Sequence, residues 1–214
     1  MSRLPVLVLL SAATLAAGDL ESARDIQDRA ALEKLAAAQT DPYRAALAYS
    51  YLSTVAMELR DKGGAKRAAE AGIPFAEKAV AAKGTSENYR ILGTLYGQVI
   101  PAAPLTAFTY GKKSQVAISK ALELDSKAAL NYISRGVGEF YLPPALGGGV
   151  ELALKDFEKA AALNPKLDEA HLWIGLAHRK AGRNADARKA LQKAIELNPR
   201  RAWTKQQLDK TPQS

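Results

Sequence analysis

Apolar residues recur every three or four positions over residues 168–201, which is the spacing of one face of an α-helix. Gly182 interrupts this pattern, and Pro199 lacks the amide hydrogen that would continue a helix, so we expect two helices with a turn between them. Small side chains at Gly175 and Ala187 should let the two helices approach closely. The predicted contact faces carry His171, Ile174, Gly175 and His178 on the first helix, and Ala187, Leu191, Ala194 and Ile195 on the second.

The order of small and apolar residues over these 34 positions resembles a tetratricopeptide repeat. With Asp168 as the first position, the small residue of the eighth position is Gly175 and the turn glycine is Gly182. The family's two alanines and closing proline are matched by Ala187, Ala194 and Pro199. The resemblance implies a helix-turn-helix unit that buries its apolar face only by stacking on similar units, so further copies are expected upstream.

Upstream residues repeat the pattern in altered form, which predicts an all-α fold. We expect a right-handed stack of antiparallel helix pairs, an α-solenoid like that of tetratricopeptide-repeat proteins, in one domain over residues 19–212. The predicted pairs span residues 41–82, 86–125, 129–164 and 168–198, with a lone helix over 20–38 before them and a short capping helix over 201–210 after them.

Two of the predicted turns are longer than the repeat requires and are rich in proline and glycine. Residues 99–114 are about nine residues too long, and residues 142–149 (LPPALGGG) add about five, so we expect ordered insertions. A helical protein with the segments GQVI, EFYLP and LGGG is similar to the periplasmic T component of tripartite ATP-independent (TRAP) transporters. That family is lipidated and assembles around a pore that contacts a substrate-binding subunit, but this chain has no cysteine for lipid attachment.

Residues 1–18 have the pattern of a secretory signal peptide: one arginine, an apolar run, and small residues before the expected cleavage after Ala17 or Gly18. The run is too short for a membrane span, which needs about 20 apolar residues. Retention as an anchor is the alternative. Cleavage predicts a periplasmic or secreted protein with no stable membrane anchor.

The composition narrows the classes of function. Without cysteine the chain can form neither disulfides nor thiolate metal sites, so its stability has to come from packing. The formal net charge is +8, but the basic residues are spread along helix exteriors and mixed with acids, which is typical of a solvated surface. We therefore expect no nucleic-acid partner.

Chemistry-bearing motifs are lacking. His171 and His178 lie two turns apart with no third ligand at standard spacing, and we interpret them as packing or groove residues. The sequence has no nucleophile elbow, Walker loop or dinucleotide fingerprint. We expect no catalytic residue, no metal and no cofactor.

Surface shape is then the expected basis of function. The resemblance implies that the first helix of each pair lines a concave face, whose middle is apolar and aromatic here and whose ends carry cations. The alternative is that Phe140 and Tyr141 only pack under the second insertion. The partner is expected to be a protein or peptide, with a periplasmic substrate-binding protein as one candidate; a small hydrophobic or anionic ligand of a TRAP-like accessory is the alternative. The expected binding residues are Arg90, Gln98, Ile133, Val137, Phe140, Tyr141, Leu172, Leu176, Arg179 and Lys180.

Overall fold

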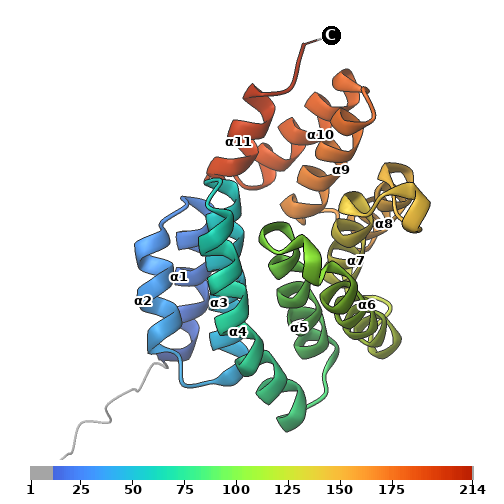
Figure 1. Cartoon of the computed structure of the whole chain (residues 1–214). Coiled ribbons are helices and arrows are strands. Elements are labelled where there is room, and N and C mark those ends of the chain that lie inside the picture. Colours follow the sequence, from blue (N-terminus) through green and yellow to red (C-terminus); the bar gives the residue numbers. More distant parts are fainter. Residues whose placement is uncertain (1–11, 214) are drawn as a thin grey trace, which may run out of the picture.

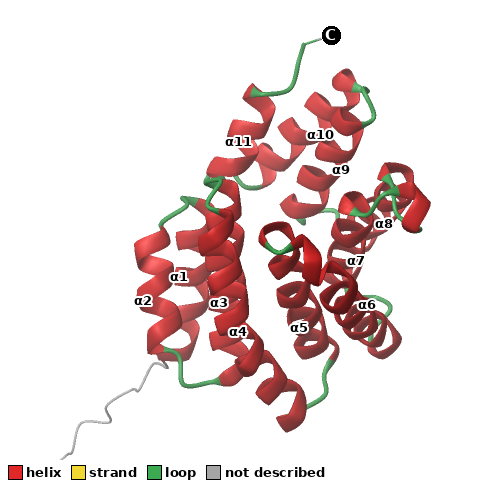
Figure 2. Ribbon diagram, viewed as in Figure 1, coloured by secondary structure: helices red, strands yellow, loops and turns green. Residues whose placement is uncertain are grey.

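The computed structural model describes residues 12–213, which form eleven α-helices and no strand (Figures 1 and 2). Successive helices form antiparallel pairs, and the pairs stack side by side (Figure 1). The predicted all-α repeat fold is therefore confirmed. None of the helices in the described part of the chain combines the length and the hydrophobicity that a bilayer crossing needs.

Five helix pairs and a final single helix make up the stack. The pairs are α1 (Ala12–Asp25) with α2 (Arg29–Ala38), α3 (Pro42–Glu58) with α4 (Lys62–Ala82), α5 (Ser86–Val99) with α6 (Ala107–Leu124), α7 (Ala129–Tyr141) with α8 (Val150–Leu163), and α9 (Asp168–Lys180) with α10 (Asn184–Leu197), followed by α11 (Ala202–Asp209). Each predicted insertion forms short 3₁₀ turns: η1 (Ile100–Ala102) and η2 (Pro104–Thr106) in the first, η3 (Pro144–Leu146) in the second.

The N-terminal region differs from the prediction. The lone helix expected over residues 20–38 is wrong, because Gln27 has a φ of 58° and breaks it into α1 and α2. Asp28 then caps α2 by accepting a hydrogen bond from the Ala31 amide at 2.9 Å, which favours a new helix start. Of the predicted signal peptide, residues 1–11 lie outside the described residues, and residues 12–18 form the first half of α1.

Glycines of the first helix allow close contact within three of the pairs. A Cβ atom added to Gly93, Gly136 or Gly175 would lie 2.6 Å from a side-chain carbon of Ile118, Phe157 or Leu191 on the second helix. Those distances are shorter than any van der Waals contact, so the helix spacing depends on the missing side chain. All three glycines occupy the eighth position of their repeat.

Two separate hydrophobic cores stabilise the described part of the chain. The N-terminal core is built by α1 to α6 around residues such as Leu20 and Ile91. The C-terminal core is built by α7 to α11 around residues such as Phe157 and Leu191. Apolar burial therefore stabilises each half separately, and the contact between the chain's two ends has to be made by other groups.

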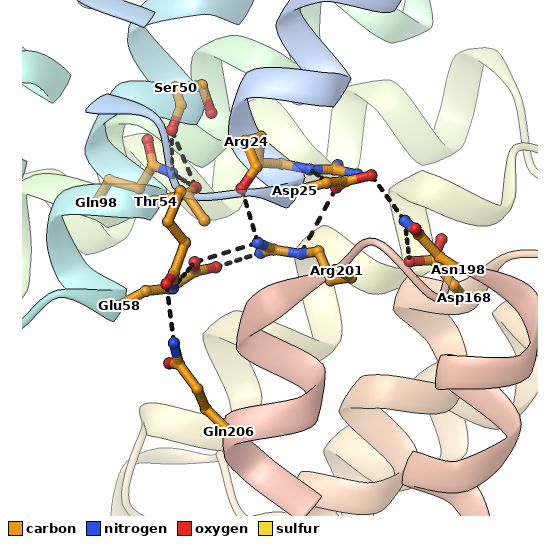
Figure 3. Close-up of polar contacts among 11 residues, drawn as sticks. Arg24, Asp25, Ser50, Thr54, Glu58, Gln98, Asp168, Asn198, Arg201 and Gln206 are labelled. Atoms are coloured by element: carbon orange, nitrogen blue, oxygen red, sulfur yellow. Dashed lines mark hydrogen bonds and ion pairs between the residues drawn. The ribbon is translucent and has the colours of Figure 1, made fainter. Parts of the chain in front are cut away.

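Polar side chains join the two ends of the stack (Figure 3). Arg201, only 5% exposed, forms a buried ion pair with Glu58 at the end of α3 and donates to the Arg24 carbonyl at 3.1 Å. Asn198 donates to Asp25 at 2.8 Å and to Asp168 at 3.1 Å, which links α10 to α1 and α9. The predicted capping helix, α11, thus also closes the stack onto its first helices. We call these interactions the closing contact.

A half-buried carboxylate lies beside the second insertion. The side chain of Glu139 on α7 is 17% exposed, and its Oε2 atom has no hydrogen-bond partner. Burial raises the pKa of Glu139 to about 7, the nearby Asp156 carboxylate adds to this effect, and Arg135 opposes it. The folded protein therefore holds a proton on Glu139 up to near-neutral pH.

Replacing Glu139 with glutamine is expected to stabilise the protein above pH 7. Between pH 4.5, the ordinary pKa of this group, and about pH 7, the folded state binds more protons than the unfolded state, so the free energy of unfolding falls as pH rises. Glu139→Gln removes this loss and should raise that free energy by about 1 to 3 kcal/mol at pH 8. At pH 4 the effect should be small.

Urea denaturation of wild type and variant at pH 4, 6 and 8 measures this difference. Glu158→Gln is the control, because Glu158 lies on the exposed face of the neighbouring helix α8. If Glu139→Gln raised the free energy of unfolding equally at all three pH values, deprotonation of Glu139 would not be the cause.

Candidate partner-binding surface

The ten expected binding residues lie on α5, α7 and α9, which are the first helices of three successive pairs. Ile133, Leu172 and Leu176 are buried in the C-terminal core. Their side chains pack between helices instead of facing a partner. A role for these three residues in binding stays a prediction, and we leave them out of the surface proposed below.

Arg90 and Gln98 tie α5 to α3. Arg90 is buried and forms an ion pair with Glu87, which also accepts a hydrogen bond from the Tyr43 hydroxyl at 2.8 Å. Burial and the Glu87 charge raise the pKa of Tyr43, so its hydroxyl remains a donor. Gln98 donates to the Ser50 carbonyl at 3.1 Å and the Thr54 hydroxyl at 3.0 Å (Figure 3). Both side chains are therefore engaged within the protein.

Three aromatic rings in the C-terminal half lie on α7, α9 and α11, which are alternate helices along the chain. Tyr141 of α7 lies 6.3 Å from Trp173 of α9, and Trp173 lies 6.0 Å from Trp203 of α11, measured between ring centroids. Both pairs meet edge to face, which is a favourable arrangement of aromatic rings. We call these three residues the aromatic row.

The residues of the aromatic row differ in exposure, and Phe140 packs beneath them. Phe140 and Trp173 are buried and in edge-to-face contact, whereas Tyr141 is 64% exposed. The packing alternative considered for Phe140 and Tyr141 thus describes Phe140 well and Tyr141 poorly. Trp203 is partly exposed at the other end, and Val137 packs partly buried against the same core.

Two cations lie beside the row and play different parts. The Lys180 ammonium lies 4.2 Å from the centroid of the Phe140 ring and also donates to the Phe140 carbonyl, while the residue remains exposed. Arg179 donates to the carbonyl of Gln207 at 3.1 Å and to its side chain at 2.8 Å, and burial lowers the pKa of Arg179. Arg179 therefore anchors α11, and Lys180 is the cation that remains accessible to a partner.

Trp173 and Trp203 were missed when the binding residues were predicted from the sequence. Trp203 lies 34 residues after Glu169, so it falls at the second position of a further repeat that begins at α11. That position is one of those that the family resemblance assigns to the concave face, and extending the repeat frame would have found it. No comparable signal marks Trp173, because its place is set by packing.

Both histidines make local hydrogen bonds. A ring nitrogen of His171 lies 3.1 Å from the Pro165 carbonyl, and Nδ1 of His178 accepts from the Arg183 guanidinium at 2.9 Å. In the part of the chain that the structure describes, no three metal-binding side chains cluster. The aromatic row and Lys180 therefore provide apolar contact area and one accessible positive charge.

Comparison with known proteins agrees with this architecture. The family model of the tetratricopeptide repeat matches residues 168–201, and curated protein sequences provide no significant match. The crystal structure of TTC0263, a thermophilic tetratricopeptide-repeat protein of Thermus thermophilus, superposes with a TM-score of 0.60 at 18% identity and covers 92% of this chain and 93% of that one.

A second solved structure has a similar degree of likeness. The HusA haemophore of Porphyromonas gingivalis superposes with a TM-score of 0.58 at 18% identity, over 91% of this chain and 96% of its own. At such identities the likeness establishes the fold. Residues 168–201 are a tetratricopeptide repeat, and the chain as a whole has the fold of tetratricopeptide-repeat proteins.

Proposed function

We propose that this protein is a noncatalytic scaffold that binds a protein or peptide partner outside the cytoplasm. The observation that carries the proposal is the aromatic row, with Tyr141 exposed at one end and Lys180 beside it. Tyrosine and tryptophan provide a large rigid contact area at little entropic cost, and they dominate the energetics of protein interfaces.

The chemistry of the row indicates the kind of segment it would hold. Apolar side chains of an extended or helical peptide would pack on Tyr141 and Trp203, and an acidic group of the peptide would meet Lys180. Arg179 contributes indirectly, because it holds α11 and therefore Trp203 in position. Ile133, Val137, Phe140, Leu172 and Leu176 belong to the C-terminal core beneath the row, whereas Arg90 and Gln98 bond within the N-terminal half and are not part of this surface.

The extracellular part of the proposal rests on the signal-peptide pattern of residues 1–18. N-terminal sequencing of the protein from its native host tests it. We expect the mature chain to begin after Ala17 or Gly18 and to fractionate outside the cytoplasm. A cytoplasmic protein that keeps these residues would contradict it.

Tyr141→Ala is expected to weaken partner binding at least tenfold, since truncation of an exposed aromatic anchor commonly costs more than about 1.4 kcal/mol. Quantitative pulldown from periplasmic extract, followed by titration of the recovered partner, measures the change. Leu105→Ala is the control, because Leu105 is a fully exposed apolar residue of the first insertion. Equal binding by both variants and wild type would remove the aromatic row from the proposal.

The alternative is a transport accessory that binds a small hydrophobic or anionic molecule, in keeping with the resemblance to TRAP T components. The row of rings beside an exposed ammonium suits a flat apolar acid as well as a peptide. Haem belongs to this class, and HusA is described as a haemophore, so haem is a reasonable first probe. Native mass spectrometry that shows only bare protein, with and without added haem, would count against this alternative.

A further inference from the structure

Helix α6 exposes more apolar surface than its packing explains. Only Ala117, Ile118 and Ala121 of its 18 residues are buried. Phe108 and Val116 lie on the outside, 86% and 63% exposed. Single exposed apolar residues are common on protein surfaces, so the position of Val116 beside a hollow is what marks this face as a candidate contact surface.

Two adjoining hollows lie between α5 and α6 beside this face. Their volumes are about 560 and 370 Å³, both are open to solvent, and they share Tyr89 and Val116. We call them together the α6 groove. Its lining comes from Tyr89, Leu92 and Tyr96 of α5 and from α6 residues between Lys112 and Glu123, including Val116.

The length and openness of the α6 groove suit a helix better than a small molecule. From Lys112 to Glu123 the helix rises by about 17 Å, which corresponds to three turns of a partner helix. Small-molecule sites enclose most of the ligand surface, whereas these hollows are open along their length. A three-turn amphipathic helix could lay its apolar face on the exposed Val116 and the partly exposed Tyr89, with the buried Leu92 at the bottom of the groove.

Charge decides which helix would fit. Among the described residues, neither Lys112 nor Lys113 forms an ion pair, and Lys113 lies 5.3 Å from the Tyr96 ring centroid. At the other end of the groove, Lys120 is already paired with Glu123 at 2.6 Å. The end near the start of α6 therefore presents two uncompensated cations next to an apolar floor.

We propose that the α6 groove binds an amphipathic helix of a partner protein, with the partner's carboxylates placed against Lys112 and Lys113. The groove lies on α5 and α6, whereas the aromatic row lies on α7, α9 and α11. The protein thus has two separate binding surfaces, as a scaffold that joins two partners requires. The proposal does not depend on what the aromatic row binds.

A pair of synthetic peptides tests the proposal directly. Both are helix formers of about four turns with leucines at helical spacing, and one carries glutamates where the other carries lysines. In an NMR titration of the mature chain, the glutamate peptide should shift the resonances of Tyr89 and Val116 and bind at least tenfold more tightly than the lysine peptide. Equal affinities, or shifts confined to other helices, would overturn the proposal.

Variants of the α6 groove test its apolar contact and its two lysines separately. Val116→Asp should weaken the glutamate peptide at least fivefold, and the double variant Lys112→Glu, Lys113→Glu should reverse the preference between the peptides. Ile26→Asp is the matched control, because Ile26 is a β-branched residue 52% exposed on the α1–α2 turn, and it should bind like wild type. Circular dichroism confirms that each variant is folded.

Binding to phosphatidylglycerol vesicles tests whether the same face binds a membrane instead of a helix. Apolar residues beside lysines could also meet an anionic membrane surface. Cosedimentation with vesicles that Val116→Asp abolishes, without any groove shifts from the glutamate peptide, would show a lipid-binding face and overturn the helix proposal.

Discussion

Gly175→Leu is expected to lower the free energy of unfolding by about 1 to 3 kcal/mol, and more if the helices cannot separate. A Cβ atom at this position would lie 2.6 Å from Cγ of Leu191 and 3.1 Å from the Ala187 carbonyl oxygen. Because Leu191 is fully buried and the Ala187 contact is backbone, neither atom can move aside cheaply. Urea denaturation monitored by circular dichroism measures the change.

Gly138→Leu is the matched control for this substitution. Gly138 lies inside α7, and a Cβ atom there would meet nothing within 4 Å. Leucine has the higher helix propensity, so this variant should be as stable as wild type or more stable by up to about 1 kcal/mol. Lys189→Leu, on the exposed face of α10, should also be nearly silent. Equal losses at Gly175 and Gly138 would show that helix contact is not the cause.

Arg201→Met is expected to destabilise the protein by about 3 to 5 kcal/mol, because it leaves the buried Glu58 carboxylate without its counter-charge. Burial already raises the pKa of Glu58, and loss of Arg201 would raise it further. Protonated Glu58 needs no counter-charge, so the destabilisation should be largest near pH 8 and shrink toward pH 4. Thermal and urea denaturation across this range measures it.

The double variant Arg201→Met, Glu58→Met distinguishes the charge from the shape of the closing contact. Buried ion pairs can often be replaced by apolar residues at little cost, so the double variant should recover much of the stability. Hydrogen exchange of α1 and α11 reports whether the two ends still meet. A double variant as unstable as Arg201→Met alone would show that the unpaired carboxylate is not the cause.

The helix pairs could be predicted because their information is local. The small residues Gly175, Ala187 and Ala194 recur at intervals that place them on one side of two short helices, and Pro199 stops the second. The break between α1 and α2 was missed, because it depends on a positive φ at Gln27, a residue that seldom marks a turn.

The candidate surface was predictable only in part. Tyr141 and Lys180 emerge on an accessible face, as the repeat positions suggested. Gln98 holds the same thirteenth repeat position in an earlier copy, yet it bonds to Ser50 and Thr54 on α3. Arg90, at the fifth position of that copy, pairs with Glu87 on its own helix. Repeat position fixes the side of the helix, and the distance to the neighbouring helix decides whether that side meets solvent.

By itself the sequence determined an all-helical stack of pairs, since apolar periodicity and small residues at the contact positions act within each pair. Only the tertiary structure decided that the stack closes on itself. Arg201 and Glu58 are 143 residues apart in sequence, and their contact results from small rotations added between successive pairs. The total rotation cannot be predicted from any local stretch of sequence. The partners of buried polar residues such as Arg201 are therefore known only from the complete structure.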